Sequence, residues 1–330
     1  MRDNTDTRIV AAFAMTHTPG LGNQTGLAQP ETLRRILDGF DIVRRQIEAA
    51  RPDVIVAFVN DHFDMYTLHA MPGMAIALGD THWGPTEATQ DWIGMPRAPR
   101  SGHAALARDI YRGAVEDGFE LFRSESAELV HNVLMPAKYL WPGASIPVVP
   151  IFLNCFAPPL PTWRRAYELG ASVRNVLDRR PERIALMASG GLSHWPPITV
   201  DEDALDDPLM QRVQRWQILG AAALRDDPGL PLAILQREAA MAASGRELVN
   251  AEWDRNILQK LAAGDRDFLL SLTHETVRAQ AGPGGAEMLM WTALMGAMRD
   301  AQADIVTYEA VPEWMGGVGV LSYARSLGRA

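Results

Sequence analysis

The sequence predicts an α/β fold, a single domain with a central mixed, partly parallel sheet flanked by helices. Three observations lead to this prediction. Short apolar and β-branched runs typical of buried strands recur along the chain, a long amphipathic stretch separates the first two, and other helical stretches precede later ones. Strand, long helix and strand in succession form the βαβ unit, which pairs its strands in parallel.

The expected elements follow from these patterns in chain order. The strand runs are RIVAAFA (8–14), DVIVAFV (53–59), SIPVVPIF (145–152), RIALMAS (183–189) and GVGVLSY (317–323). Between the first two, residues 31–50 place apolar side chains at helical spacing. The stretches 103–119 and 163–178 are expected to be helices that lead into strands, and residues 204–271 are expected to be mostly helical.

Two Pro-rich segments interrupt these patterns, at 157–161 and 195–208. Each is short and lies between strand-like and helical pieces, so we interpret both as loops. The 330 residues would allow one large domain or two smaller ones. We expect one catalytic domain over residues 1–330.

Composition excludes several classes of protein. The net charge is −9 with no basic run, which argues against nucleic acid as a partner. No apolar stretch approaches the roughly 18 residues that cross a bilayer, and the polar N-terminus (1–8) lacks a signal core. The single cysteine, Cys155, cannot form an internal disulfide, and we expect it to be buried. A soluble cytoplasmic protein fits these features.

Three of the eight histidines directly follow expected strands. His17 follows the first strand run, His62 the second and His194 the fourth. In open α/β sheets, ligands bind beyond the carboxyl ends of the strands, so these three side chains could converge. Four other histidines lack this context and are interpreted as structural or surface residues. They are His69, His82, His103 and His274.

Glu287 lies between a glycine-rich turn and a strongly apolar stretch, in AGPGGAEMLMW (281–291). A buried carboxylate there would need a cation or hydrogen-bond donors. An exposed first-turn position, stabilised by the helix dipole, is the alternative. Two histidines and a carboxylate form the facial triad of non-haem Fe(II) oxygenases, but the same set also binds Zn²⁺ in hydrolases. The residues themselves leave both metals open.

Seven segments resemble the class III (type II) extradiol ring-cleavage dioxygenases, which include the protocatechuate 4,5-dioxygenase catalytic subunit, gallate and 3-O-methylgallate dioxygenases and 2,3-dihydroxyphenylpropionate 1,2-dioxygenase. They occur in order along nearly the whole chain. The segments are MTHTPGLG, VNDHFD, IPVVPIFLNCFAPPLP, SGGLSHWPP, EWDRNILQKL, AGPGGAEMLMW and VPEWMGGVGVLS.

The resemblance implies roles for individual residues. His17, His62 and Glu287 would bind Fe(II), and His194 would be the catalytic acid/base. His131 falls where the family has a second active-site histidine, although its neighbours differ from the family's Asp-His-Gly motif. Glu252 and Asp254 compete with Glu287 for the third ligand position. The family motif favours Glu287, and Asp254 is interpreted as a structural or supporting carboxylate.

The implied reaction inserts both atoms of O₂ into a catecholic aromatic acid of the protocatechuate, gallate, methylgallate, dihydroxyphenylpropionate or lignin-derived biaryl type. Arg97 and Arg100 are candidates to bind its carboxylate, and an exposed positive loop is their other interpretation. We expect a homo-oligomer, with a separate small helical subunit as the other arrangement. A Zn-dependent hydrolase and a non-catalytic subunit are the alternatives. GLGNQTG (20–26) departs from the dinucleotide-binding spacing, so that function is not expected.

Overall fold

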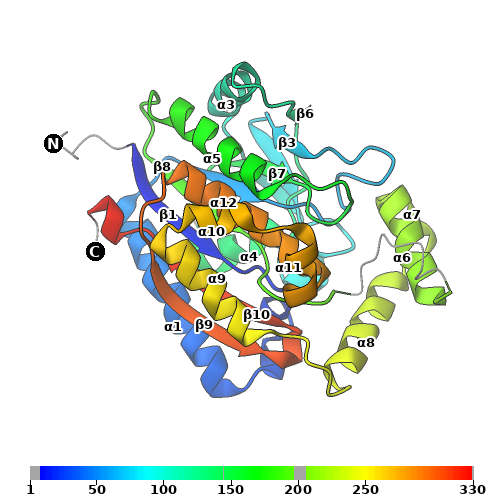
Figure 1. The fold of residues 1–330 in the computed structure, drawn as a ribbon. Coiled ribbons are helices and arrows are strands. Elements are labelled where there is room, and N and C mark those ends of the chain that lie inside the picture. Colours follow the sequence, from blue (N-terminus) through cyan, green and yellow to red (C-terminus); the bar gives the residue numbers. More distant parts are fainter. Residues whose placement is uncertain (1–7, 144, 197–205, 329–330) are drawn as a thin grey trace.

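A mixed sheet forms the centre of the computed structural model, which describes residues 8–143, 145–196 and 206–328. Within these ranges eight strands pair in the order β6-β3-β7-β2-β8-β1-β10-β9 (Figure 1). Their bounds are β1 (Ile9–Met15), β2 (Val54–Val59), β3 (Met74–Ala77), β6 (Phe122–Ser124), β7 (Val148–Leu153), β8 (Ile184–Ser189), β9 (Asp304–Val311) and β10 (Gly316–Ser322). The predicted α/β class and all five predicted strands are confirmed.

The four central strands determine where side chains can meet. β7, β2, β8 and β1 are neighbours and all run parallel. Their carboxyl ends therefore lie at one edge of the sheet. β10 runs antiparallel to β1, so β10 begins at this same edge. We call it the carboxyl edge.

Helices cover both faces of the sheet. On one face α5 (Trp163–Leu177) and α12 (Met288–Ala297) pack together, with α3 (Ala104–Glu116) and α9 (Ala251–Ala263) beside them (Figure 1). On the other face lie α1 (Pro30–Ala50) and α4 (His131–Leu140). Side chains of a strand point alternately to the two faces of the sheet. Ala12 and Ala14 therefore pack in the core beneath α5 and α12, whereas Phe13 and Met15 pack in the core beneath α1 and α4.

The predicted helices are confirmed with small changes at their ends. α1 begins at Pro30, where the missing N–H of proline costs nothing, and its capping residue Arg51 has a left-handed backbone. α5 packs closely on α12 because Gly170 has no Cβ, which would lie 1.8 Å from the Ala293 carbonyl oxygen. The loop at 157–161 joins β7 to α5 as expected.

A group of three helices follows the central strands. These helices, α6 (Pro208–Leu219), α7 (Ala221–Asp226) and α8 (Leu230–Ala242), lie to one side of the sheet and its covering helices (Figure 1). They bury a small core of their own around Met210, Val213 and Leu230. A backbone bond of 2.8 Å from the Leu68 N–H to the Gln217 carbonyl ties them to the main body.

The rest of the helical region follows this group. α10 (Arg266–Ser271) and α11 (His274–Ala281) lead back to the sheet side. The prediction that 204–271 is mostly helical is confirmed from residue 206 onward. Two predicted features lie outside the described residues. They are the polar N-terminus (1–8), apart from Arg8, and most of the loop at 195–208. Among the helices that are described, none is both long and apolar enough to cross a bilayer.

Five strands were not predicted from the sequence. β3, β6 and β9 lie in the outer parts of the sheet, and β4 (Thr81–Gly84) and β5 (Ala98–Ser101) form a separate hairpin. β9 is half-exposed along most of its length, and β6 has only three residues. Such strands lack the continuous apolar run that identifies a buried strand.

Candidate metal centre

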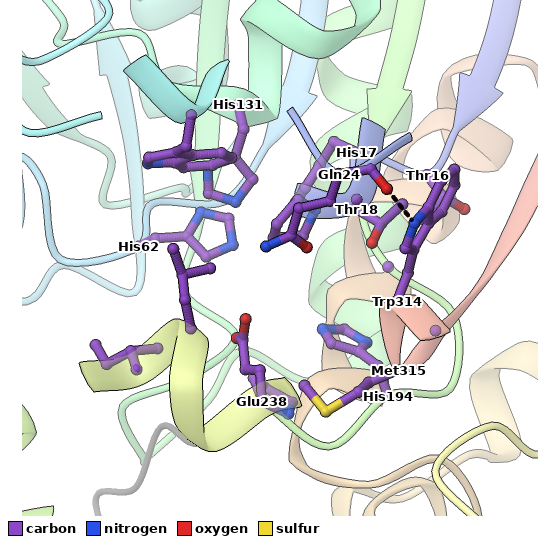
Figure 2. A pocket seen from close by; sticks show the side chains of 18 of the residues that line it. Thr16, His17, Thr18, Gln24, His62, His131, His194, Glu238, Trp314 and Met315 are labelled. Atoms are coloured by element: carbon purple, nitrogen blue, oxygen red, sulfur yellow. Dashed lines mark hydrogen bonds between the residues drawn. The ribbon is translucent and has the colours of Figure 1, made fainter. Parts of the chain in front are cut away.

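The carboxyl edge brings the predicted site residues together. His17 follows β1, His62 follows β2 and His194 follows β8. Glu287 ends a short 3₁₀ turn (Pro283–Glu287) immediately before α12, and His131 is the first residue of α4. All five side chains line one cavity with a volume of about 230 Å³. Figure 2 shows the four histidines facing this space.

The Glu287 carboxylate lies at the centre of the histidines. Its Oε2 is 3.2 Å from His17 Nε2, and its Oε1 is 3.5 Å from both His62 Nε2 and His194 Nε2. The backbone N–H of Gly191 also donates to Oε2. Glu287 is only 1% exposed, so the buried interpretation of this residue holds and the exposed one is wrong.

A second feature is the stacking of the histidine rings. The rings of His62 and His131 have centroids 4.0 Å apart, and His17 lies 5.3 Å from His62 and 5.1 Å from His131. One ligand nitrogen from each of these three histidines lies within 4.8 Å of the other two. Two overlapping sets could therefore hold a metal: His17 and His62 with Glu287, or His17 and His62 with His131.

Burial and mutual charge shift the protonation of these groups. Burial lowers the pKa of His62, and it lowers the pKa of His131 much further with the help of His62 and His17. Burial also opposes charge on Glu287, but His17 and His194 hold its pKa well below the usual range. Burial opposes charge on His194, but Glu287, the Leu192 carbonyl and Asp254 together outweigh it and raise the pKa.

Hydrogen bonds orient the histidine rings. Ser189 Oγ lies 2.8 Å from His17 Nδ1, which directs His17 Nε2 toward Glu287. His194 Nδ1 lies 2.9 Å from the Leu192 carbonyl oxygen, so Nδ1 carries the proton and Nε2 is free to accept one. The Asn60 amide nitrogen lies 3.1 Å from His62 Nε2. Sequence reasoning missed Ser189 and Asn60, although both lie within the motifs that identified the histidines.

The loop that carries His194 is fixed from outside the site. Asp254 on α9 is fully buried and accepts from the Ser193 N–H at 2.8 Å and from the Tyr308 hydroxyl at 2.7 Å. This arrangement agrees with the supporting role expected for Asp254. Its neighbour Glu252 is exposed on the surface of the same helix and does not line the cavity. Glu252 is therefore no rival to Glu287.

Glycines allow the close approach of these groups. A Cβ at Gly284 would lie 2.2 Å from His194 Cε1, and one at Gly191 would lie 2.3 Å from the same atom. Neither position tolerates a larger side chain unless the His194 ring moves. The glycines of SGG and GPGG therefore determine where His194 and Glu287 can lie.

The residues at this site fit a divalent metal ion. His17 Nε2, His62 Nδ1 and His131 Nδ1 are buried nitrogens without a hydrogen-bond partner. Two atoms that each bind one metal at about 2.1 Å are separated by about 3.0 to 3.4 Å in octahedral or tetrahedral geometry. The 3.2 Å between Glu287 Oε2 and His17 Nε2 lies within this range, and the 3.5 Å between Oε1 and His62 Nε2 is just above it. A cation would also compensate the buried carboxylate.

The two arginines proposed for carboxylate binding lie elsewhere. Arg97 forms a bidentate ion pair with Glu128, with N–O distances of 2.6 and 2.7 Å, and contacts the Trp83 ring. Arg100 is on β5, and neither arginine lines the cavity. The interpretation of these arginines as substrate-binding residues is therefore not supported.

The remaining histidines make structural contacts, as expected. His82 is buried and lies 3.2 Å from the Val148 carbonyl oxygen, His103 caps α3, and His274 contacts the Pro161 carbonyl oxygen. His69 is exposed. Cys155 is buried as predicted, and burial raises the pKa of its thiol well above the usual value.

The glycine-rich segment after β1 forms part of the cavity wall. Residues 19–21 and 25–27 form two 3₁₀ turns, so no helix begins where a dinucleotide-binding motif would place one. Gly20 lies against the Trp314 ring, and the Trp314 indole N–H donates to the Gln24 carbonyl oxygen at 3.0 Å (Figure 2).

The α6–α8 helices supply a wall that sequence reasoning missed. Their apolar side chains Trp216, Leu224, Ile234 and Leu235 line the cavity, and so does Glu238 on α8. Burial raises the pKa of Glu238 to about 7. Glu238 lies four and three residues after Ile234 and Leu235, on the same face of the helix. In the sequence, a glutamate on the apolar face of a helix is the signal that could have identified Glu238 as a cavity residue.

Comparisons with known proteins agree with this geometry. The model of the family described as the catalytic LigB subunit of aromatic ring-opening dioxygenase matches residues 11–320. Among curated relatives, a 2,3-dihydroxyphenylpropionate/2,3-dihydroxicinnamic acid 1,2-dioxygenase of Photorhabdus laumondii is 29% identical, covering 95% of this chain and 96% of the relative. A protein of the same name from Burkholderia vietnamiensis is 30% identical, covering 93% of this chain and 95% of the relative.

Proposed function

The chain belongs to the family of catalytic subunits of aromatic ring-opening dioxygenases, and from this membership we propose that it is an Fe(II)-dependent extradiol dioxygenase. Its substrate would be a ring with two adjacent hydroxyl groups, and both atoms of O₂ would enter the product. The observation that carries the proposal is the buried Glu287 carboxylate, 3.2 and 3.5 Å from the histidines at the ends of β1 and β2.

We assign His17, His62 and Glu287 as the residues that hold the metal. Two neutral imidazoles and one carboxylate leave a divalent ion with a net charge of +1, which favours an anionic catechol. When bound, Fe(II) supplies a redox-active centre with open positions for both catechol oxygens and O₂. Ser189 and Gly191 support this set through their contacts with His17 and Glu287.

His194 is positioned to move a proton. Its Nδ1 is engaged by the Leu192 carbonyl, so Nε2 is the atom that accepts a proton from a substrate hydroxyl. The imidazolium that results lies 3.5 Å from Glu287 Oε1, which stabilises its charge. The same Nε2 can return the proton when a product oxygen needs it. His194 is held by its loop and by Asp254 for this role.

His131 has a different role because of its environment. It is buried, its pKa is well below the usual value, and its ring stacks on His62. A neutral His131 can donate one hydrogen bond to a substrate oxygen without adding positive charge. The surrounding Trp92 and Phe156 rings keep water from this side of the cavity, since they contact His131 and His62 respectively.

Metal analysis and O₂ uptake test the proposal together. The protein purified without oxygen should contain iron, and with Fe(II) it should consume O₂ and form a yellow ring-opened product from a panel of catechols. A protein that retains zinc and hydrolyses esters or amides would instead support the Zn-dependent hydrolase, for which the same set of two histidines and one glutamate has precedent. Iron-loaded protein that consumes no O₂ with any catechol would contradict the proposal.

A further inference from the structure

Apart from its four histidines, the ionisable residues that line the cavity are acidic. Among its described lining residues, four are acidic: Asp64, Glu238, Glu287 and Glu313. None of those lining residues is lysine or arginine. The neighbouring segment 197–205 lies outside the described residues, and its sequence also contains no lysine or arginine. Glu287 is compensated within the proposed metal site, and burial raises the pKa of Asp64 well above its usual value, which disfavours its charge. Glu238 interacts with His194, but no lysine or arginine among the described lining residues pairs with Glu238 or Glu313.

The arginines near the site do not change this balance. Arg97 is held in its ion pair with Glu128, and Arg100 lies on the β4–β5 hairpin. A substrate carboxylate normally requires an arginine, a lysine or several N–H donors once it leaves water. In this cavity it would instead meet the apolar wall of the α6–α8 helices and the carboxylate of Glu238.

Glu238 is the acidic group best placed to act on a ring substituent. Figure 2 shows its side chain pointing into the cavity that His62 and His194 also face. It stands on the wall that Ile234 and Leu235 form on α8, opposite the strand ends that carry His62 and His194. A ring substituent that points from the strand ends toward α8 would meet this carboxylate.

We propose that the cavity selects catechols whose ring substituent carries no negative charge, and that Glu238 is the residue that disfavours the carboxylated ones. This proposal rests on the proposed function, because it takes the two hydroxyl groups to bind at the metal centre. The substrate class is thus a neutral catechol with an apolar, amide, ester or hydroxyl-bearing substituent. The named relatives, in contrast, act by their printed names on carboxylic acids.

The test uses pairs of catechols that differ in charge but hardly in shape. One pair is 3-(2,3-dihydroxyphenyl)propionate and its primary amide, and a second pair is 3,4-dihydroxybenzoate and 3,4-dihydroxybenzamide. The iron-loaded protein is assayed at pH 8, where Glu238 is ionised because its pKa is about 7. In at least one pair, we expect kcat/KM to be higher for the amide by about tenfold or more.

Two variants assign the effect to one residue. Glu238→Gln should raise the acid-to-amide ratio of kcat/KM by about tenfold. Glu247→Gln removes the same charge from an exposed position outside the cavity and should leave the ratio unchanged. An unchanged ratio in Glu238→Gln, or an equal change in both variants, would overturn the assignment to Glu238.

Binding without oxygen separates this inference from the proposed function. Dissociation constants of both pairs, measured anaerobically by calorimetry on the iron-loaded protein, report selection even if no ring is cleaved. Tighter binding of the amides without any O₂ uptake would support the selection and contradict the dioxygenase. Ring cleavage with the acids preferred would overturn the selection and leave the dioxygenase standing.

Discussion

A carboxylate that is almost fully buried needs compensating positive charge, and among the described residues the polar groups that contact the Glu287 carboxylate are histidines and one backbone N–H. Neutral imidazoles cannot supply that charge. Either a histidine is protonated or a cation shares the site. The partnerless Nε2 of His17 favours a cation, because one metal ion could bind both this nitrogen and the carboxylate oxygen 3.2 Å away.

Replacement of Glu287 tests this conclusion directly. We expect Glu287→Ala to lower the iron bound per chain by about tenfold or more, because the variant lacks the charged ligand. Glu252→Ala removes an exposed carboxylate from α9 and should retain its iron. Metal content by mass spectrometry after anaerobic purification gives the comparison. Loss of iron from Glu252→Ala alone would exclude Glu287 as the third ligand.

His194 should affect turnover rather than metal binding. We expect His194→Ala to lower kcat by about 10² to 10⁴-fold, the range typical of a lost general acid/base. Iron content and anaerobic catechol affinity should be nearly unchanged. His69→Ala, an exposed histidine, is the matched control and should behave as wild type. Near wild-type kcat in His194→Ala would remove His194 from the mechanism.

At the scale of secondary-structure elements, the strands that can be predicted from the sequence are those buried on both faces of the sheet. The five central or near-central strands are fully buried, so each appears as a continuous apolar run. β9 is half-exposed along most of its length and includes Thr307 and Glu309, and its pairing with β10 depends on contacts that local sequence does not report. Outer strands of this kind are specified by their neighbours.

The contact between α9 and the His194 loop predicts a pH dependence of stability. Burial raises the pKa of Asp254 to about 6, so the native state holds this proton more tightly than the unfolded chain does. The stabilising contribution is complete below the ordinary aspartate pKa and is lost as the pH rises through about 6. Ionised Asp254 therefore lowers the free energy of unfolding near neutral pH.

Asp254→Asn isolates that contribution, because asparagine can still accept from the Ser193 N–H. The free energy of unfolding of the variant minus that of wild type should increase by about 1 kcal/mol between about pH 5 and pH 7.5. Urea unfolding at several pH values measures the difference, in which the titration of all other groups cancels. A difference that is constant with pH would show that Asp254 has an ordinary pKa.

At the scale of the whole molecule, buried side chains form two large cores and one small one. The large cores lie on the two faces of the sheet, and the small core is confined to the α6–α8 helices. The cavity lies where these helices meet the carboxyl edge. In the proposed function, substrate binding would therefore depend on a helical group whose packing is largely separate from that of the sheet.

Val213→Ala should show experimentally whether the α6–α8 helices and the sheet are stabilised separately. The lost methyl groups weaken the small core by about 1 to 2 kcal/mol, while the sheet keeps its packing. We expect faster amide hydrogen exchange in residues 208–242 and a higher KM, with little change in the main thermal transition. Phe58→Ala, in a large core, should lower that transition clearly. A matching loss in Val213→Ala would show that the molecule unfolds as one unit.

The separation between the sheet and the α6–α8 helices explains which site residues can be predicted from the sequence. His17, His62 and His194 follow strands of one parallel set, so topology alone brings them together. Glu287 needed the family motif in addition, because its neighbours in sequence do not show where its helix begins. Glu238 belongs to a helix whose position is set by packing at a distance, and no strand end indicates it.

The separation of the α6–α8 helices from the sheet also bears on how such proteins diversify. The atoms proposed for metal binding come from short segments anchored in the sheet and beside α12, whereas the ring substituent would meet residues 206–249. Exchange of that continuous segment between relatives would replace one wall and leave the anchored segments intact. A change of substrate, from one aromatic compound to another, would then require a single recombination event instead of many coordinated substitutions.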